Sequence, residues 1–334
     1  MKRMEERLRK VLFSVTREYI KTRRPVSSRK VLDVTNMDWS GATIRNDMKR
    51  LEEMGYLYQP HTSAGRIPTD RALRFYLDEI LKMRETWKEE NLGIDLSPNF
   101  PIGDLSTILD ALARIVSRAV SGLVVMTRPK FSDLKIMGVY STPITKDFAV
   151  VSAVTELGLS SVVPIKSSGI DLESLERLLR LFSGRTFREV FEILNGMEIE
   201  DEDLREAMKT VRNVLKLMML GEGPIVRGIA ELLKEFQGRE LEGLIRVIED
   251  QGMVEEIARR ADGGLRVFIG SENEIEALRP FSVFVAPYRK SSLRIGSVIL
   301  ITSKYVVYER IYPMIEFVSN RLTEYLTVTS REVM

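Results

Sequence analysis

The stretch SGATIRNDMKRLEEMGYLYQPHTSAGRIPTD, residues 40–70, changes its pattern halfway along. Its first half carries apolar residues at the spacing of one helix face, namely Ile44, Met48 and Leu51. Ser40 occupies the position of an N-cap, and Gly55 stands where a residue of positive φ commonly ends a helix. The second half contains two short extended pieces around a loop that holds the only histidine, His61. The stretch therefore predicts a helix followed by a two-stranded hairpin.

Two further helices are predicted upstream of this stretch. Residues 4–21 place apolar side chains at helical spacing, and Ser27 can cap a short second helix. Three helices followed by a two-stranded wing make a winged helix-turn-helix. A fourth helix, over about 70–89, could connect this domain, residues 1–90, to the rest of the chain.

The helix that begins after Ser40 carries residue types that suit DNA recognition on the side opposite its apolar stripe. Arg45 and Asn46 can make bidentate hydrogen bonds to guanine and adenine, respectively. Lys49 and Arg50 lie one turn further on, where they could meet phosphates. The loop HTSAGR adds hydroxyls, an imidazole and a guanidinium for close approach to the DNA backbone. The candidate DNA-binding residues are Ser40, Ala42, Thr43, Arg45, Asn46, Lys49, Arg50, His61, Thr62, Ser63 and Arg66.

The N-terminal part of the chain is basic and the remainder is acidic. Residues 1–74 hold 17 Lys and Arg against 9 Asp and Glu, a balance of +8, whereas the remaining residues hold 33 against 39, a balance of −6. A basic module on an acidic body is typical of a protein that binds a polyanion with one end. An ordinary helical domain with a solvated charged face is the alternative for this region.

The composition excludes several kinds of chemistry. Cysteine is absent and histidine occurs once, which excludes disulfides, thiolate metal sites and most histidine-based catalysis. His61 has no second histidine and no local acid cluster to support it as a base or metal ligand. We therefore expect no metal, no cofactor and no enzymatic activity. No stretch approaches about 18 uncharged apolar residues, so we expect no membrane span. The absence of cysteine fits a cytoplasmic location.

The rest of the chain alternates between helix and strand signals after a boundary rich in Gly, Pro and Asn at 91–104. We expect strands at 121–129, 133–142, 148–156, 160–167, 265–272, 281–289 and 292–302. We expect helices at 105–120, 171–183, 186–194, 200–220, 225–236, 240–249, 252–261 and 311–327. The strands between 133 and 167 are separated by tight turns, as in an antiparallel meander. GEGPIVRG, residues 221–228, lacks the Lys-Ser/Thr ending of a phosphate loop and is interpreted as a linker.

Residues 42–70, ATIRNDMKRLEEMGYLYQPHTSAGRIPTD, closely resemble the signature of the HrcA family, the heat-inducible transcription repressors of bacteria. Three later segments also resemble family blocks: GIAELLKEF at 228–236, VFIGSENE at 267–274, and the stretch 296–322. The resemblance implies an α+β fold with an N-terminal winged helix-turn-helix and a GAF-like α/β domain that carries an inserted α/β dimerisation domain. The implied domains are 1–90 for DNA binding, 104–130 with 221–334 for the GAF-like domain, and 131–220 for the insertion.

The resemblance also implies partners. Similar proteins bind double-stranded DNA at an inverted-repeat operator, the CIRCE element, ahead of chaperone genes, and repress those genes as homodimers. The GroE chaperonin maintains their active state, so GroEL is an expected partner. The interface between the two copies is expected mainly in the inserted domain.

The sequence departs from the family pattern in one C-terminal block. That block usually reads close to GPTRMDY, whereas this chain reads LITSKYVVY at 300–308. Ser303, Lys304 and Tyr305 occupy the matching place. The departure leaves the role of this loop open, although it does not affect the candidate DNA-binding residues.

A different class of function is the alternative. In that interpretation the GAF-like body is a small-ligand sensor, and the winged helix serves protein contacts only. Salt distinguishes the two interpretations. When Lys and Arg bind DNA, the logarithm of the binding constant falls with the logarithm of the salt concentration, with a slope of about −0.9 per neutralised phosphate.

Overall fold

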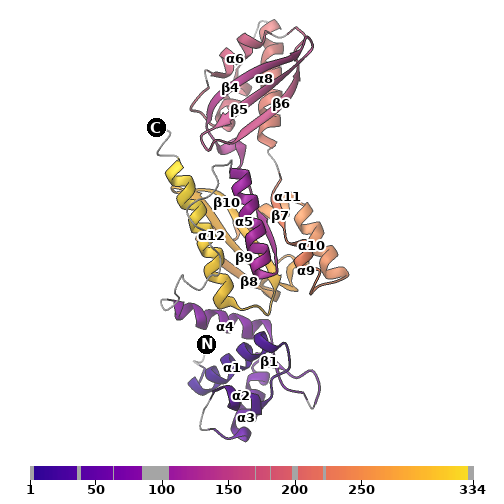
Figure 1. Ribbon diagram of the computed structural model, residues 1–334, viewed down its shortest axis with the longest axis vertical. Coiled ribbons are helices and arrows are strands. Elements are labelled where there is room, and N and C mark those ends of the chain that lie inside the picture. The colour runs from indigo at the N-terminus through magenta and orange to yellow at the C-terminus, as the bar shows by residue number, and fades with distance from the viewer. Residues whose placement is uncertain are drawn as a thin grey trace.

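The computed structural model describes residues 4–35, 39–62, 64–84, 105–169, 171–180, 182–197, 202–220 and 223–329. The molecule is elongated, with three units stacked along its long axis (Figure 1). We name them the N-terminal unit, residues 4–84; the central unit, residues 105–130 and 223–329; and the distal unit, residues 131–220. The central unit separates the other two (Figure 1).

The N-terminal unit contains three helices and a two-stranded ribbon before a fourth helix. These elements are α1 (Glu6–Thr22), α2 (Ser28–Thr35), α3 (Gly41–Glu53), β1 (Leu57–Tyr58), β2 (Ile67–Pro68) and α4 (Asp70–Lys82). Their order is the one predicted. Gly55 has a φ of 77° at the end of α3, as its predicted role requires. The first three helices enclose a core of Leu8, Val11, Leu12, Val15, Val31, Ile44, Met48 and Leu51.

The ribbon is fixed to the start of α2. Val26 and Arg66 form an antiparallel bridge, with N···O distances of 2.9 and 2.8 Å. Gly65 lies so close to Val26 that a Cβ atom would overlap the Val26 backbone. The return arm of the ribbon therefore packs on the loop between α1 and α2, which holds its base in place.

Helix α4 contacts two cores. Ala72 lies in the core of the N-terminal unit, whereas Leu73, Tyr76 and Leu77 lie in a core of the central unit. The helix ends at Lys82 and not at the expected residue 89. The predicted boundary at 91–104 lies outside the described residues.

The central unit is a three-layer arrangement around a five-stranded antiparallel sheet of order β7-β3-β10-β9-β8. The strands are β3 (Leu123–Met126), β7 (Ile225–Arg227), β8 (Arg266–Ile269), β9 (Phe281–Lys290) and β10 (Leu293–Ser303). Helices α5 (Leu105–Val120) and α12 (Tyr308–Thr329) cover one face (Figure 1). Helices α9 (Ile229–Leu232), α10 (Arg239–Glu249) and α11 (Gln251–Arg259) lie on the other. Val124 and Met126 pack toward α5 and α12, and Leu123 and Val125 toward α10 and α11.

Two expectations for residues 221–236 are wrong. Ile225–Arg227 are not linker or helix but the edge strand β7, which pairs with β3 and places Ile225 opposite Met126. The helix expected over 225–236 is reduced to Ile229–Leu232. Gly228, with a φ of 94°, separates the strand from the helix, and a Cβ atom there would overlap the Gly122 carbonyl. Pairing with β3 thus decides a conformation that so short a segment does not encode.

The distal unit is a three-stranded antiparallel meander covered by helices on one face. Its strands are β4 (Ile136–Thr145), β5 (Phe148–Thr155) and β6 (Ser160–Lys166), with β5 in the middle. Its helices are α6 (Leu172–Arg180), α7 (Phe187–Gly196) and α8 (Glu202–Leu220). The predicted meander is confirmed, and the described residues have the mixed α and β content of the expected class. No helix in the described ranges is both long and apolar enough to cross a membrane.

Candidate nucleic-acid interface

The structure holds α3 by its apolar stripe and by one buried acid. Ile44, Met48 and Leu51 are buried against the other helices of the N-terminal unit, as predicted. Asp47 is also buried, and its carboxylate accepts hydrogen bonds from Arg7 Nε at 2.7 Å and Nη2 at 3.0 Å. These hydrogen bonds raise the pKa of Arg7. Asp47 follows Ile44 by three residues, so the helical period places it on the buried side, and sequence reasoning missed this role.

The N-terminal end of α3 is capped as predicted. The Ser40 Oγ atom accepts a hydrogen bond from the Thr43 backbone N at 3.1 Å and lies 2.9 Å from Thr43 Oγ1. Ser40 is exposed and Thr43 is half-buried. The first amides of a helix have no intrahelical partners and can bind an anion. The cap therefore places the hydroxyls of Ser40 and Thr43 at the N-terminal end of α3, and this end of a helix is suited to bind a phosphate.

The exposed face of α3 brings together most of the predicted contact residues. Ala42, Arg45, Asn46 and Lys49 are exposed on this face. Arg50 is exposed too, but its guanidinium pairs with Glu5 at 3.1 Å. Within the described residues, no ion pair holds Arg45 or Lys49. Their side chains are thus available to an external anion.

The loop of the ribbon has a structure of its own. Gln59 Nε2 donates to the carbonyls of Thr62 at 3.0 Å and Ala64 at 2.8 Å, and Ala64 N donates to His61 O at 2.9 Å. His61 and Thr62 are exposed in this loop, which extends from the side of the N-terminal unit (Figure 1). Ser63 lies outside the described residues. The turn presents the imidazole and the Thr62 hydroxyl to solvent.

Arg66 does not lie with the exposed loop residues. Its guanidinium pairs with Glu52 near the end of α3 at 2.9 Å, and its side chain is only 15% exposed. Together with its backbone bridge to Val26, this pair joins the ribbon to α3 and to the start of α2. The structure therefore gives Arg66 a bracing position within the unit, away from the predicted tip.

The central unit has a cavity of about 230 Å³ beside the end of β3. Lys130, Glu255, Arg259 and Arg294 line part of it. Glu255 pairs with Lys130 at 2.7 Å and with Arg259 at 3.1 Å, and these pairs hold the pKa of Glu255 below its usual range. Arg294 pairs in turn with Asp262, so each of these four charges has an ion-pair partner and none gives specific support to the ligand-sensor alternative.

Comparison with known proteins gives a consistent result over the whole chain. A family model described as the HrcA protein C terminal domain matches residues 106–312. The heat-inducible transcription repressor HrcA of Thermotoga maritima is 39% identical over 99% of this chain and 96% of its own length. The HrcA repressor of Moorella thermoacetica is 30% identical over 97% of this chain and 98% of its own. A crystal structure of a hypothetical protein, 38% identical, has a TM-score of 0.74 over 98% of this chain and 100% of that chain.

These matches define the class of protein as a transcription repressor and not an enzyme. The chain belongs to the HrcA family of heat-inducible transcription repressors. Membership of this family implies DNA as the partner and the heat-shock response as the process that is regulated.

Proposed function

We propose that the protein is a sequence-specific repressor of chaperone genes that binds an inverted-repeat operator of the CIRCE type as a dimer in the cytoplasm. In this proposal the N-terminal unit is a winged helix-turn-helix, the central unit a GAF-like domain, and the distal unit the inserted dimerisation domain. The observation that carries the proposal is the exposed face of α3, where Arg45, Asn46 and Lys49 lie opposite a fully buried stripe.

The residues of α3 and the ribbon divide into three roles. Arg45 and Asn46 read base edges in the major groove, since their planar groups can form bidentate hydrogen bonds. Contacts that position the protein on phosphates come from Ser40, Ala42, Thr43, Lys49, Arg50, His61, Thr62 and Ser63. Arg66 acts through its ion pair with Glu52, which holds the ribbon against α3. Arg50 can exchange its exposed pair with Glu5 for a phosphate at small cost.

The dimer interface is proposed on the open face of the distal sheet. The helices cover only one face, and the other exposes Tyr140, Phe148 and Val162, which are 50%, 38% and 60% exposed. The strand register places Tyr140 and Val162 on either side of Ser152, on the same face as Phe148. A second copy that covers this face would form a two-fold dimer, which matches a two-fold operator.

Sedimentation tests the dimer separately from DNA binding. We expect a dimer at micromolar concentration, and V162D is expected to shift the protein toward the monomer because it buries a charge in the interface. A strictly monomeric wild type would remove this part of the proposal.

The link to the chaperonin is supported by family membership alone. We expect added GroEL with its co-chaperonin to raise the fraction of protein that binds operator DNA. If the chaperonin neither binds the protein nor changes that fraction, this link does not hold for this chain.

Binding to DNA tests the central claim. The wild type and the double variant Arg45→Ala with Asn46→Ala are titrated with an inverted-repeat duplex and a scrambled duplex at two salt concentrations. The control is Arg246→Ala, which removes an exposed arginine from α10 of the central unit. We expect the wild type and the control to prefer the repeat. The double variant should lose about 1–3 kcal/mol per missing base contact and keep only weak, salt-sensitive binding.

Equal binding of both duplexes by all three proteins would show that α3 does not read sequence. Salt then separates the remaining alternatives. If the binding constant falls with salt as steeply as several neutralised phosphates require, the protein binds DNA nonspecifically. If the protein binds no DNA at either salt concentration, the result favours the ligand-sensor alternative.

A further inference from the structure

Helix α4 packs against both the N-terminal unit and the central unit, between which it lies (Figure 1). Its side toward the central unit buries Leu73, Tyr76 and Leu77 in the core that includes α12. Tyr76 also donates a hydrogen bond to Glu309 in the first turn of α12. We call the contacts of α4 and of the end of α1 with the central unit the junction. The side chains of the junction are closely packed, so they hold the two units together.

Asp70, the first residue of α4, binds two different segments of the central unit. Its Oδ1 atom pairs with Lys304 Nζ at 2.8 Å, and its Oδ2 atom accepts a hydrogen bond from Ser271 N at 2.8 Å. One turn further along α4, Arg74 Nε donates to Glu272 Oε1 at 2.7 Å. The side chains of Asp70 and Lys304 are 24% and 22% exposed, so solvent screens this pair only in part.

Gly270 permits the close approach of Asp70. It has a φ of 57°, and a Cβ atom on it would overlap the Asp70 carboxylate. Any other residue at this position would displace the Asp70 carboxylate from its contacts with the central unit and would also be strained in its backbone. The fit at this point is therefore specific in both geometry and charge.

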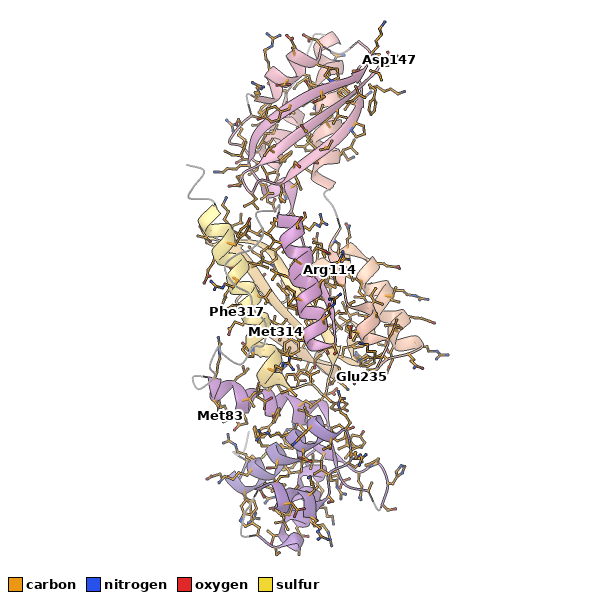
Figure 2. All side chains as sticks on the ribbon, in the orientation of Figure 1. Met83, Arg114, Asp147, Glu235, Met314 and Phe317 are labelled. Carbon is orange, nitrogen blue, oxygen red and sulfur yellow. The ribbon has the colours of Figure 1, made fainter. Side chains whose placement is uncertain are left out.

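The end of α1 contributes a second set of contacts. Arg23 donates to Ser303 Oγ from both terminal nitrogens at 3.2 Å and pairs with Glu235 at 3.2 Å. Figure 2 shows Glu235 at the side of the central unit that faces the N-terminal unit. Tyr19 and Tyr305 meet edge to face with 4.9 Å between ring centroids. Two helices of the N-terminal unit thus hold the same loop.

Ser303, Lys304 and Tyr305 are the residues at which the sequence departs from the family pattern. Each of the three contacts the N-terminal unit, through Arg23, Asp70 and Tyr19 respectively. The loop therefore connects β10 of the central sheet directly to the unit that carries α3.

We propose that the contact of Asp70 with Lys304 and Gly270 sets the orientation of the N-terminal unit on the central unit, and so the separation between operator half-sites that a dimer accepts. This inference rests on the proposed function. Asp70, Lys304 and Gly270 are positioning residues: they do not reach DNA, and they act by fixing where α3 points.

The physical reason is the helical repeat of DNA. One additional base pair between half-sites moves the second half-site by about 3.4 Å and rotates it by about a tenth of a turn. A rigidly held N-terminal unit cannot follow this change without breaking contacts at the junction or on DNA. A unit released from the junction can follow it, so it accepts several separations with similar affinity.

The test measures preference for separation and not affinity alone. The probe is the inverted repeat that the wild type selects from a randomised duplex library. Duplexes with one or two base pairs added or removed between the half-sites, and a single half-site, are compared with it. The variants are Lys304→Ala and Gly270→Ala, the conservative variant is Lys304→Arg, and the control is Lys234→Ala. Lys234→Ala removes an ion pair with Glu231 on the surface of the same central unit.

We expect both Lys304→Ala and Gly270→Ala to bind the single half-site as the wild type does, while their preference for the native separation falls several-fold. Lys304→Arg, which keeps the charge, and Lys234→Ala should retain the preference of the wild type. The inference is overturned if Lys304→Ala binds the half-site normally and keeps the full preference. Failure of the wild type to select any inverted repeat from the library would instead overturn the proposed function. If Gly270→Ala does not fold, Lys304→Ala alone decides the question.

Discussion

Asp47 of α3 and Arg7 of α1 form a two-point ion pair across the N-terminal unit, at 2.7 and 3.0 Å. The Asp47 side chain is only 5% exposed, so its charge faces the core side of α3 and not the surface that carries Arg45 and Lys49. A carboxylate on the outer surface would repel phosphates. The pair therefore orients α3 and also keeps its outer face free of one negative charge.

Asp47→Ala is expected to lower the thermal midpoint of unfolding, because it removes both hydrogen bonds and leaves a space beside the core. Glu6→Ala is the matched control, since Glu6 pairs with Lys10 of its own helix and both side chains are largely exposed. We expect the control to shift the midpoint much less. Calorimetry of the three proteins makes the comparison, and equal midpoints for the two variants would contradict it.

The cap at Ser40 separates a stability effect from a DNA effect. Ser40→Ala removes the acceptor for Thr43 N and is expected to destabilise the N-terminal unit by about 0.5–2 kcal/mol. Ser40→Asp keeps an acceptor and adds a favourable charge at the helix N-terminus, so stability should be retained. The same charge repels phosphate, so operator affinity should fall for Ser40→Asp. Denaturant unfolding measures the stability of both variants, and DNA titration measures their operator affinity. If Ser40→Asp keeps the affinity of the wild type, the N-terminal end of α3 at Ser40 does not face DNA.

Gly55 and Gly196 are expected to respond differently to substitution by alanine. Gly55 has a φ of 77°, a conformation that costs an L-residue about 1–2 kcal/mol, so Gly55→Ala should destabilise the protein. Gly196 lies at the end of α7, and a Cβ atom there meets nothing within 4 Å. Gly196→Ala should be neutral or stabilising by up to about 1 kcal/mol. The denaturant midpoints of both variants test this comparison. If Gly196→Ala lowers the stability as much as Gly55→Ala does, the positive φ of Gly55 is not the cause of the loss.

Glu156 joins the distal unit to the central unit through its ion pair with Lys290 at 2.5 Å, and it also accepts a hydrogen bond from Lys135 N of its own unit at 3.1 Å. Burial pushes the pKa of Glu156 upward, but the hydrogen bonds from Lys290 and Lys135 and the charge of Lys290 outweigh it and hold the pKa below the ordinary 4.5. The contact therefore stabilises the fold fully above pH 4.5, and its contribution is lost as the pH falls through the folded pKa.

Wild type and Glu156→Gln are compared by denaturant unfolding across this range. The difference in free energy of unfolding should be largest and constant near neutral pH, and it should shrink in acid. A difference that does not change with pH would show that Glu156 contributes through its shape and not through its charge.

Much of the candidate DNA interface follows from local sequence. The helical period places Arg45, Asn46 and Lys49 opposite Ile44 and Met48, and a helix with one apolar stripe has only one side to expose. The structure confirms their exposure. The helical period also places Asp47 on the buried side of α3. Its partner Arg7 lies 40 residues away in the sequence, and no local pattern identifies Arg7 as that partner.

Two predicted placements, of Arg66 at the loop tip and of residues 225–227 in a linker or helix, were wrong where a tertiary contact decides the outcome. Arg66 follows the exposed loop in sequence, and only the position of Glu52 on α3 draws its side chain inward. Ile225–Arg227 form a strand because β3 offers them an unpaired edge. Three residues are too few to show a period of their own, so the helical signal of the following segment extended over them.

The sequence by itself determined the local elements and the family. Caps, glycine positions and hydrophobic periods act over a few residues, so they can be recognised in α3, in the meander β4 to β6 and in α5 without any knowledge of the fold. The tertiary structure decided which charges meet. Asp70 and Lys304 are 234 residues apart, and each belongs to an element whose own pattern is complete without the other. Pairing of such groups depends on how the units pack, because ion pairs and close glycine contacts require atoms within a few ångströms, and only folding of the whole chain sets those distances.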